Sequence, residues 1–246
     1  MTACVNPAIS EVSESRTHDV FNQPPPLENY NLFDTDKALQ EAVEREGAAG
    51  AKGPLSIFGE ILGRGETIRL GVLANKYPPV LYTHDRYGNR RDEVEFHPAW
   101  HEMMSLGIAE GVHSRPWADP YAGAHVARAA AYQMYSQIEN GTQCPLTMTY
   151  AVVPVVRREA RDSPWLHDVW LPRLMSRRYD QRFLPIEEKF GALIGMGMTE
   201  KQGGSDVRAN TTRAEPLGTG CARQEHRIRG HFKKGGGVQL VQKVTV

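Results

Sequence analysis

A loop of small and polar residues at 195–207 has the composition of a ligand-binding segment. It follows a short apolar run and carries two hydroxyl side chains, Thr199 and Ser205, beside the glycines Gly203 and Gly204. Glycine lets backbone N–H groups approach a flat polar ligand without obstruction by side chains. The pattern therefore predicts a ligand-binding loop, and an ordinary glycine-rich connection between two strands is the alternative with the same composition.

The loop also resembles the signature of a known enzyme family. Thr199-Glu200 followed by Gly204-Ser205-Asp206 resembles the T-E-x-x-x-G-S-D sequence with which acyl-CoA dehydrogenases open their β domain. Other segments resemble the AidB-type branch of that family, and they are Phe21-Asn22-Gln23-Pro24, Phe96-His97-Pro98-Ala99-Trp100-His101, Cys144-Pro145-Leu146-Thr147-Met148-Thr149 and Asn210-Thr211-Thr212-Arg213-Ala214-Glu215.

The resemblance implies a flavoprotein. Members of the family combine an N-terminal helical domain, a middle β domain and a C-terminal helical domain, which enclose FAD and an acyl thioester, usually in a homotetramer. The implied cofactor-binding residues lie in one turn, and they are Met196, Gly197, Met198, Thr199, Gly204 and Ser205. By this resemblance Thr199 would hydrogen-bond the flavin ring edge, and Ser205 would face the cofactor from the end of the loop. The implied enzyme is an oxidoreductase acting on CH–CH groups, in which a carboxylate takes the α-proton and the flavin accepts a hydride.

The resemblance ends just after Gly230-His231. The family continues with an aromatic-rich strand of the W-F-x-S type, whereas this sequence continues with Phe232, lysines and glycines towards Val246. We therefore expect that strand, the rest of the β domain and the C-terminal domain with its catalytic carboxylate to be missing. No catalytic residue is assigned, and the chain alone should retain FAD weakly or not at all. A truncated or frameshifted gene product would end in this way, and a genuine variant strand closing a smaller β subdomain is the alternative.

Composition favours a globular protein of the cytoplasm. Lys plus Arg equals Asp plus Glu at 29 each, so no net charge attracts nucleic acid or an anionic membrane. Cys4, Cys144 and Cys221 are far apart and form no CxxC pair, which argues against a disulfide framework and a zinc site. The N-terminus lacks the features of a signal peptide, and no apolar run reaches the length of a membrane span.

The pattern along the chain predicts a mainly α fold. Residues 1–33, with the run Pro24-Pro25-Pro26, are interpreted as an extended N-terminal arm. Residues 34–185 form the predicted helical domain, which begins with Thr35 or Asp34 as the cap of a helix that Gly47 ends. Further helices are predicted at 54–63, 66–76, 98–111, 122–140, 145–160 and 165–178.

Two parts of the sequence interrupt this helical pattern. Residues 85–90 form a predicted turn with strand-like flanks, an excursion between helices. Residues 186–246 are interpreted as a partial middle β domain with a divergent tail from about residue 232. Within it, the apolar run 190–198 predicts a buried strand, and strands are also predicted at 207–215 and 225–232.

Several weaker signals have ordinary structural interpretations. His97 and His101 have a spacing that can bind a metal, but no third ligand is near in sequence, so no metal site is predicted. Lys233 and Lys234 precede the glycines rather than follow them, which excludes a phosphate loop. Cys144, at a predicted helix start, is interpreted as a packed thiol, with a reactive thiolate as the alternative.

A band of arginines in 157–182 is the remaining positively charged feature. Such a band can bind phosphates, although a solvated helix face or a subunit contact is the more frequent use. Its members are Arg157, Arg158, Arg161, Arg173, Arg177, Arg178 and Arg182. AidB-type proteins are associated with DNA and with the alkylation response, but the DNA-binding region of the family lies in its C-terminal part.

Three hypotheses about function follow. The first is a fragment of an FAD-dependent acyl-CoA dehydrogenase-like oxidoreductase that is not catalytically competent alone. The second is a non-catalytic interaction module for a protein or DNA partner, including a possible homo-oligomer. The third is a non-functional product, which would expose apolar faces and aggregate.

Overall fold

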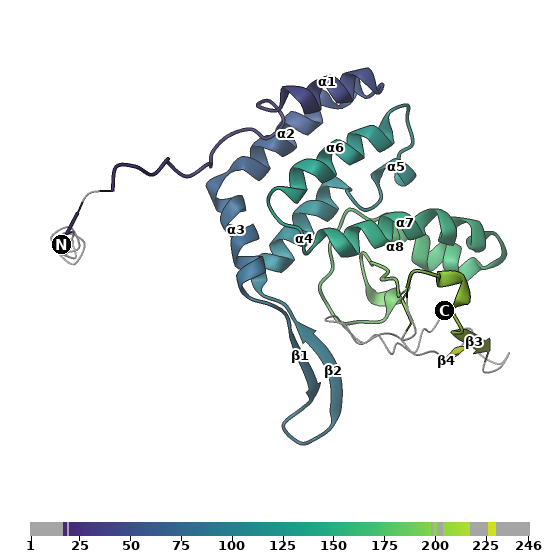
Figure 1. Ribbon diagram of the computed structural model, residues 1–246. Coiled ribbons are helices and arrows are strands. Elements are labelled where there is room, and N and C mark those ends of the chain that lie inside the picture. The colour runs from purple at the N-terminus through teal and green to yellow at the C-terminus, as the bar shows by residue number, and fades with distance from the viewer. Residues whose placement is uncertain (1–16, 19, 198, 201–203, 217–225, 230–246) are drawn as a thin grey trace, which may run out of the picture.

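The protein is described by a computed structural model covering residues 17–18, 20–197, 199–200, 204–216 and 226–229. Most described residues belong to helices, so the predicted mainly α fold is confirmed (Figure 1). The principal helices are α1 (Lys37–Arg45), α2 (Lys52–Gly63), α3 (Gly65–Lys76), α4 (Pro98–Glu110), α5 (Arg115–Ala118), α6 (Ala124–Ser136), α7 (Gln143–Glu159) and α8 (Leu171–Leu174). A short 3-10 turn, η3 (Ala49–Ala51), joins α1 to α2.

Two local signals set the ends of these helices. Pro98 occupies the first turn of α4, where its missing N–H costs nothing, and Gly111 ends the helix in the left-handed region with φ 79°. α1 is capped by Asp36, whose Oδ1 accepts a hydrogen bond of 2.9 Å from the backbone N of Leu39. The prediction of Thr35 or Asp34 as this cap was wrong, because the Thr35 hydroxyl instead donates to the carbonyl oxygen of Asn31.

The larger hydrophobic core lies where the N-terminal helices pack on α6. α2 packs on α6 and α3 packs on α4. The fully buried side chains of this core include Phe33, Phe58, Leu62, Met103, Met104, Met134, Tyr135 and Leu146. The segment 29–33 belongs to it as well, since Leu32 and Phe33 are each only 2% exposed. The end of the predicted N-terminal arm is therefore packed on α2.

A smaller core joins α7 to α8. Val153, Val156, Leu171 and Leu174 form its buried centre, and Ile194 packs against it. The single helix predicted at 165–178 was wrong: the structure has a π-helical turn, η5 (Leu166–Trp170), followed by the short α8. Pro172 lies at the start of α8 and has no N–H to continue a regular helical ladder from the preceding turn.

An antiparallel ribbon projects from the junction of α3 and α4 (Figure 1). It consists of β1 (Val80–His84) and β2 (Arg90–Glu95), and it pairs Val80 with Glu95. At the tip, Oδ1 of Asp85 accepts hydrogen bonds from the backbone N of Tyr87 and of Asn89. The predicted turn with strand-like flanks is confirmed.

The region after residue 185 is only partly as predicted. The buried strand predicted at 190–198 was wrong: residues 190–197 belong to no strand, and Phe190 and Met196 are about half exposed. The backbone N of Ala192 donates to the carbonyl oxygen of Arg173, so this segment bonds to the helical body rather than to a neighbouring strand.

Strands do form further along the chain. β3 (Arg213–Pro216) and β4 (His226–Arg229) pair antiparallel, with Arg213 opposite Arg229. β4 lies inside the predicted strand 225–232, and β3 overlaps the predicted strand 207–215 and ends one residue after it. The first prediction began too early, because the 3-10 turn η7 (Val207–Ala209) occupies its start.

Candidate functional site

A buried carboxylate closes the loop that the sequence singles out. Glu200 is 0% exposed. Its Oε2 accepts hydrogen bonds from the backbone N of Thr211 at 2.8 Å and from the Thr211 hydroxyl at 3.2 Å. Its Oε1 accepts from the backbone N of Thr212 at 2.6 Å and from the Thr212 hydroxyl. One side chain therefore joins the two ends of the segment 200–212.

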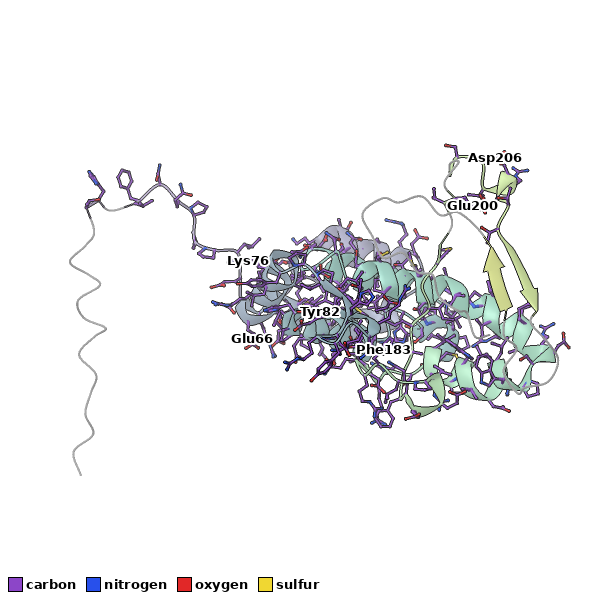
Figure 2. All side chains as sticks on the ribbon, turned by 90° about the horizontal axis from the view of Figure 1, so that it is seen from below. Glu66, Lys76, Tyr82, Phe183, Glu200 and Asp206 are labelled. Carbon is purple, nitrogen blue, oxygen red and sulfur yellow. The ribbon has the colours of Figure 1, made fainter. Side chains whose placement is uncertain are left out.

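The far part of the loop has its own anchor. Oδ1 of Asp206 accepts a hydrogen bond of 3.2 Å from the backbone N of Arg208 and so caps the turn η7. Figure 2 shows Glu200 and Asp206 at the same end of the molecule, next to the β3–β4 pair. The hydrogen bonds of Glu200 and Asp206 thus fix the loop at two points.

Thr199 and Gly204 approach each other across this loop. A Cβ atom at Gly204 would lie 2.8 Å from the Oγ1 atom of Thr199, closer than a real Cβ contact. Thr199, Gly204 and Ser205 are all exposed. Glycine at position 204 therefore keeps the loop narrow, while the Thr199 and Ser205 side chains remain accessible.

The other predicted cofactor-binding residues precede this turn. Met196 and Gly197 are exposed and lie on the segment that leads to Thr199. Met198 lies outside the described residues. The structure thus brings Thr199 and Gly204 together, with Ser205 next to them in the chain.

Helix α7 positions the segment that enters the loop. The Thr149 hydroxyl accepts a hydrogen bond of 3.1 Å from the backbone N of Ile194, and the Met148 Sδ atom lies 3.3 Å from the backbone N of Met196. Both α7 residues belong to the run 144–149, which resembles the AidB-type branch of the family. The helical body and the loop are therefore connected through this run.

A second buried carboxylate fixes the start of α7. Glu139 is 2% exposed, and its two oxygens accept hydrogen bonds of 2.6 Å from the backbone N of Gly141 and of Thr142. The Tyr135 hydroxyl donates to the carbonyl oxygen of Met103 at 2.8 Å and also bonds the Thr142 hydroxyl. These contacts tie the α6–α7 connection to α4.

Upstream of the loop, Asp180 organises residues 180–190. Its carboxylate bonds the guanidinium of Arg182 at 2.6 and 2.8 Å and the backbone N of Phe190 at 3.0 Å. The hydrogen bonds from Arg182, together with those from backbone N–H groups, hold the pKa of Asp180 well below its ordinary value. The guanidinium groups of Arg178 and Arg182 lie over the Phe190 ring, 4.1 and 4.7 Å from its centroid.

The arginine band makes contacts inside the protein. Arg173 donates to the carbonyl oxygens of Lys189, Val169 and Glu187, each at 2.9 Å. Arg177 donates to the carbonyl oxygen of Ala109, and Arg157 donates to that of Trp117. These bonds use N–H groups that a phosphate would need, so Arg157, Arg173 and Arg177 contribute to packing within the protein.

The two histidines with metal-like spacing have separate partners. His97 caps α4, since its Nδ1 accepts from the backbone N of Ala99 at 3.1 Å, and its ring stacks on Tyr77. The Nδ1 atom of His101 lies 2.7 Å from the Tyr179 hydroxyl. In the part of the chain that the structure describes, no group of three or more His, Cys, Asp or Glu is placed to hold a metal ion.

Cys144 differs from the packed thiol that the sequence suggested. It lies in the first turn of α7 and is exposed. Lys233, Lys234 and the glycines that follow them lie outside the described residues. None of the helices described is long and apolar enough to cross a membrane.

Several buried polar residues were not identified from the sequence. They are Glu139, His113 and the half-buried Arg128, and the structural role of Glu200, a residue identified only as part of the signature, was missed as well. Glu139 binds Thr142, three residues later, and Glu200 binds Thr211, 11 residues later. Because the two spacings differ, no common sequence pattern marks these carboxylates.

Comparison with known proteins gives a consistent set of relatives. Residues 22–181 match the family described as the adaptive response protein AidB N-terminal domain. The putative acyl-CoA dehydrogenase AidB of Escherichia coli K12 is 48% identical over 217 residues, which cover 88% of this chain and 39% of that protein. The chain therefore spans about two fifths of the length of this curated relative.

Two solved structures share the fold. Caenorhabditis elegans ACDH-11 in complex with C11-CoA has a TM-score of 0.70 at 22% identity, over 89% of this chain and 36% of that one. The apo form of Bd2924 has a TM-score of 0.70 at 25% identity, over 85% of this chain and 40% of that one.

Proposed function

Because the chain belongs to the family of the AidB N-terminal domain, we propose that it supplies the helical domain and the flavin-edge loop of an FAD-dependent acyl-CoA dehydrogenase-like oxidoreductase. In this proposal residues 34–185 form the helical domain, and the segment from 186 begins the middle β domain. The observation that carries the proposal is the loop closed by Glu200, which presents Thr199, Gly204 and Ser205 at the surface.

The loop fits the edge of a flat polar cofactor. A Cβ at Gly204 would meet Thr199, so the backbone there comes closer to its neighbour than any other residue type would allow. Thr199 offers an accessible hydroxyl and Ser205 a second one on the same loop. The residues proposed to contact FAD are Met196, Gly197, Met198, Thr199, Gly204 and Ser205. When bound, the flavin would supply the acceptor for a hydride taken from the acyl chain.

The residues of this chain would bind and orient rather than transfer protons. Thr199 would donate or accept a hydrogen bond at the ring edge, and Glu200 would hold the loop in the shape that allows this contact. Helix α7 would set the distance between the loop and the helical body through Thr149. The family's catalytic carboxylate is expected in the C-terminal domain, so we propose that this chain alone does not turn over an acyl-CoA substrate.

The test is an equilibrium titration of FAD by flavin fluorescence, combined with gel filtration. Wild-type chain should bind FAD weakly and lose it on the column. Thr199→Val should weaken binding about fivefold to thirtyfold, because it removes one hydrogen bond of about 1–2 kcal/mol. Thr83→Val, at an exposed position on the distant ribbon, is the matched control. Absence of binding at saturating FAD, or equal binding by both variants, would contradict the assignment of this loop.

The family description also suggests a cellular context. We propose that the full-length protein acts in the adaptive response to alkylation, since the matched family is named for that response. The measurement is the survival of a deletion strain after treatment with a methylating agent, compared with the same strain carrying the full-length gene. Equal survival would remove this part of the proposal and would leave the cofactor assignment untouched.

A further inference from the structure

A cavity of about 270 Å³ lies among α2, α5, α6 and the end of α4. These elements are on the side of the molecule away from the β3–β4 pair, so the cavity is separate from the proposed flavin loop (Figure 1). Its wall is largely apolar and includes Leu55, Val112, Ala127 and Ala131. Three charged side chains, Glu110, Arg115 and Arg128, also line it.

Arg128 is held rigidly beside this cavity. Its Nε donates to the carbonyl oxygen of Val112 at 2.9 Å. Its guanidinium carbon lies 4.0 Å from the ring centroid of Tyr150 and 4.4 Å from that of Tyr132. The aromatic faces stabilise the cation, but they do not provide hydrogen-bond acceptors for its remaining N–H groups.

The charge of Arg128 lacks an anionic partner among the described residues. Its Nη2 atom is buried without a hydrogen-bond partner there, and none of the ion pairs found in that part of the chain includes Arg128. The Arg128 side chain is half-buried, and this burial lowers its pKa. A partly buried cation with an unpartnered N–H group and no counter-ion is costly, so a group that supplied negative charge here would be stabilised.

The carboxylate on the cavity wall is already used. Glu110 bonds Arg115 at 2.7 Å, and the two side chains are 19% and 31% exposed. His113, close to this cluster, is 1% exposed, and burial holds its pKa at about 4, so it adds no charge at neutral pH. The wall therefore carries two guanidinium groups against one carboxylate, an excess of one positive charge.

We propose that this cavity binds a small monocarboxylate with an apolar body. The carboxylate would lie between the guanidinium groups of Arg115 and Arg128, and the apolar part would contact Leu55, Ala127 and Ala131. The planar fork of arginine matches the geometry of a carboxylate. A volume of about 270 Å³ is below the usual range for drug-sized ligands, so the ligand is correspondingly small.

The test is saturation-transfer NMR on the whole chain with 4-phenylbutyrate as the probe. The uncharged 4-phenylbutyramide has the same apolar body and serves as the ligand control. The acid should bind with a dissociation constant on the order of a millimolar, and the amide about tenfold more weakly, because charged hydrogen bonds are lost. Equal binding of acid and amide, or no transfer to either at about 5 mM, would overturn the proposal.

Two pairs of variants place the binding in the cavity. Ala127→Leu fills the space, whereas Ala129→Leu adds the same group at an exposed position of the same helix. Arg115→Gln removes a cavity guanidinium, whereas Arg158→Gln removes an exposed one that also pairs with a glutamate. We expect the first of each pair to weaken acid binding about tenfold and the second to leave it within about twofold. Circular dichroism checks that each variant is folded, and unchanged binding by folded Ala127→Leu would also overturn the proposal.

Discussion

Gly63 lies so close to Tyr30 that a Cβ atom at position 63 would be 1.6 Å from the Tyr30 carbonyl oxygen. The backbone N of Asn29 donates to the carbonyl oxygen of Gly63 at 2.6 Å, which brings the two backbones together. This contact holds the end of the N-terminal arm on α2, where Leu32 and Phe33 enter the core.

Gly63→Ala should therefore destabilise the fold by about 1–3 kcal/mol, because the arm must move away from α2. Urea unfolding followed by circular dichroism measures the change. Gly53→Ala on the same helix is the matched control, since a Cβ there meets nothing within 4 Å. The control should stabilise by up to about 1 kcal/mol through helix propensity. Equal effects of the two variants would show that the arm does not pack as described.

Glu200→Gln should loosen the loop without unfolding the helical body. The amide would turn an NH₂ group towards donors on Thr211 or Thr212, at a local cost of about 1–3 kcal/mol. Amide hydrogen exchange at Thr211 and Thr212 should become about tenfold to hundredfold faster. Glu159→Gln, at an exposed surface ion pair, should leave these rates unchanged. Unchanged exchange in Glu200→Gln would mean that the carboxylate does not hold the loop.

His113 should make the protein less stable in mild acid. Burial holds its pKa at about 4, below the ordinary value of 6.5, and the neighbouring Arg177 and Arg128 act in the same direction. Between these two pH values the unfolded chain binds a proton that the folded chain does not. The free energy of unfolding should therefore fall by about 3 kcal/mol as the pH decreases from 6.5 to 4.

The measurement for His113 is a series of urea unfolding curves across this pH range. His113→Gln removes the titrating group and should reduce the change in the free energy of unfolding with pH. His167→Gln, at an exposed side chain, should leave that change as in the wild type. A wild-type curve with no more slope than that of His113→Gln would contradict the assignment.

Tyr135→Phe should cost about 1–3 kcal/mol of stability. The change leaves the buried carbonyl oxygen of Met103 without the hydrogen bond that the Tyr135 hydroxyl donates to it, and it removes the contact of that hydroxyl with the Thr142 hydroxyl. Thermal unfolding measures the loss. Tyr87→Phe on the exposed tip of the ribbon is the control and should behave as wild type. A Tyr135→Phe protein with wild-type stability would mean that water replaces the lost hydroxyl.

The helices could be predicted from sequence where local residues set their ends. Pro98 begins α4 and Gly111 ends it, and the predicted range 98–111 differs from the observed helix by one residue. The ribbon was recognised for the same reason, since Asp85 makes its own turn contacts. Helix caps and turns depend on residues only a few positions apart, so they can be predicted from the local sequence.

The segment 190–198 could not be predicted in this way, because its contacts are not local. A short apolar run is compatible with a strand, but a strand also needs a neighbouring backbone to pair with. Here the backbone N of Ile194 bonds the Thr149 side chain on α7, a contact between residues that are distant in sequence. The role of Glu200 could not be predicted for the same reason, because its partners Thr211 and Thr212 are not its neighbours in sequence. The assignment of cofactor contacts at Thr199 and Ser205 stays a prediction.

The packing of α2 on α6 also orders events during synthesis. Leu55 and Phe58 leave the ribosome before Ala127 and Ala131, which follow about 70 residues later in the chain. At a synthesis rate of about 5–20 residues per second, roughly 4 to 14 s pass between the synthesis of α2 and that of α6. During that interval the apolar face of α2 is exposed on the nascent chain, and transiently exposed apolar surface of this kind is prone to aggregation.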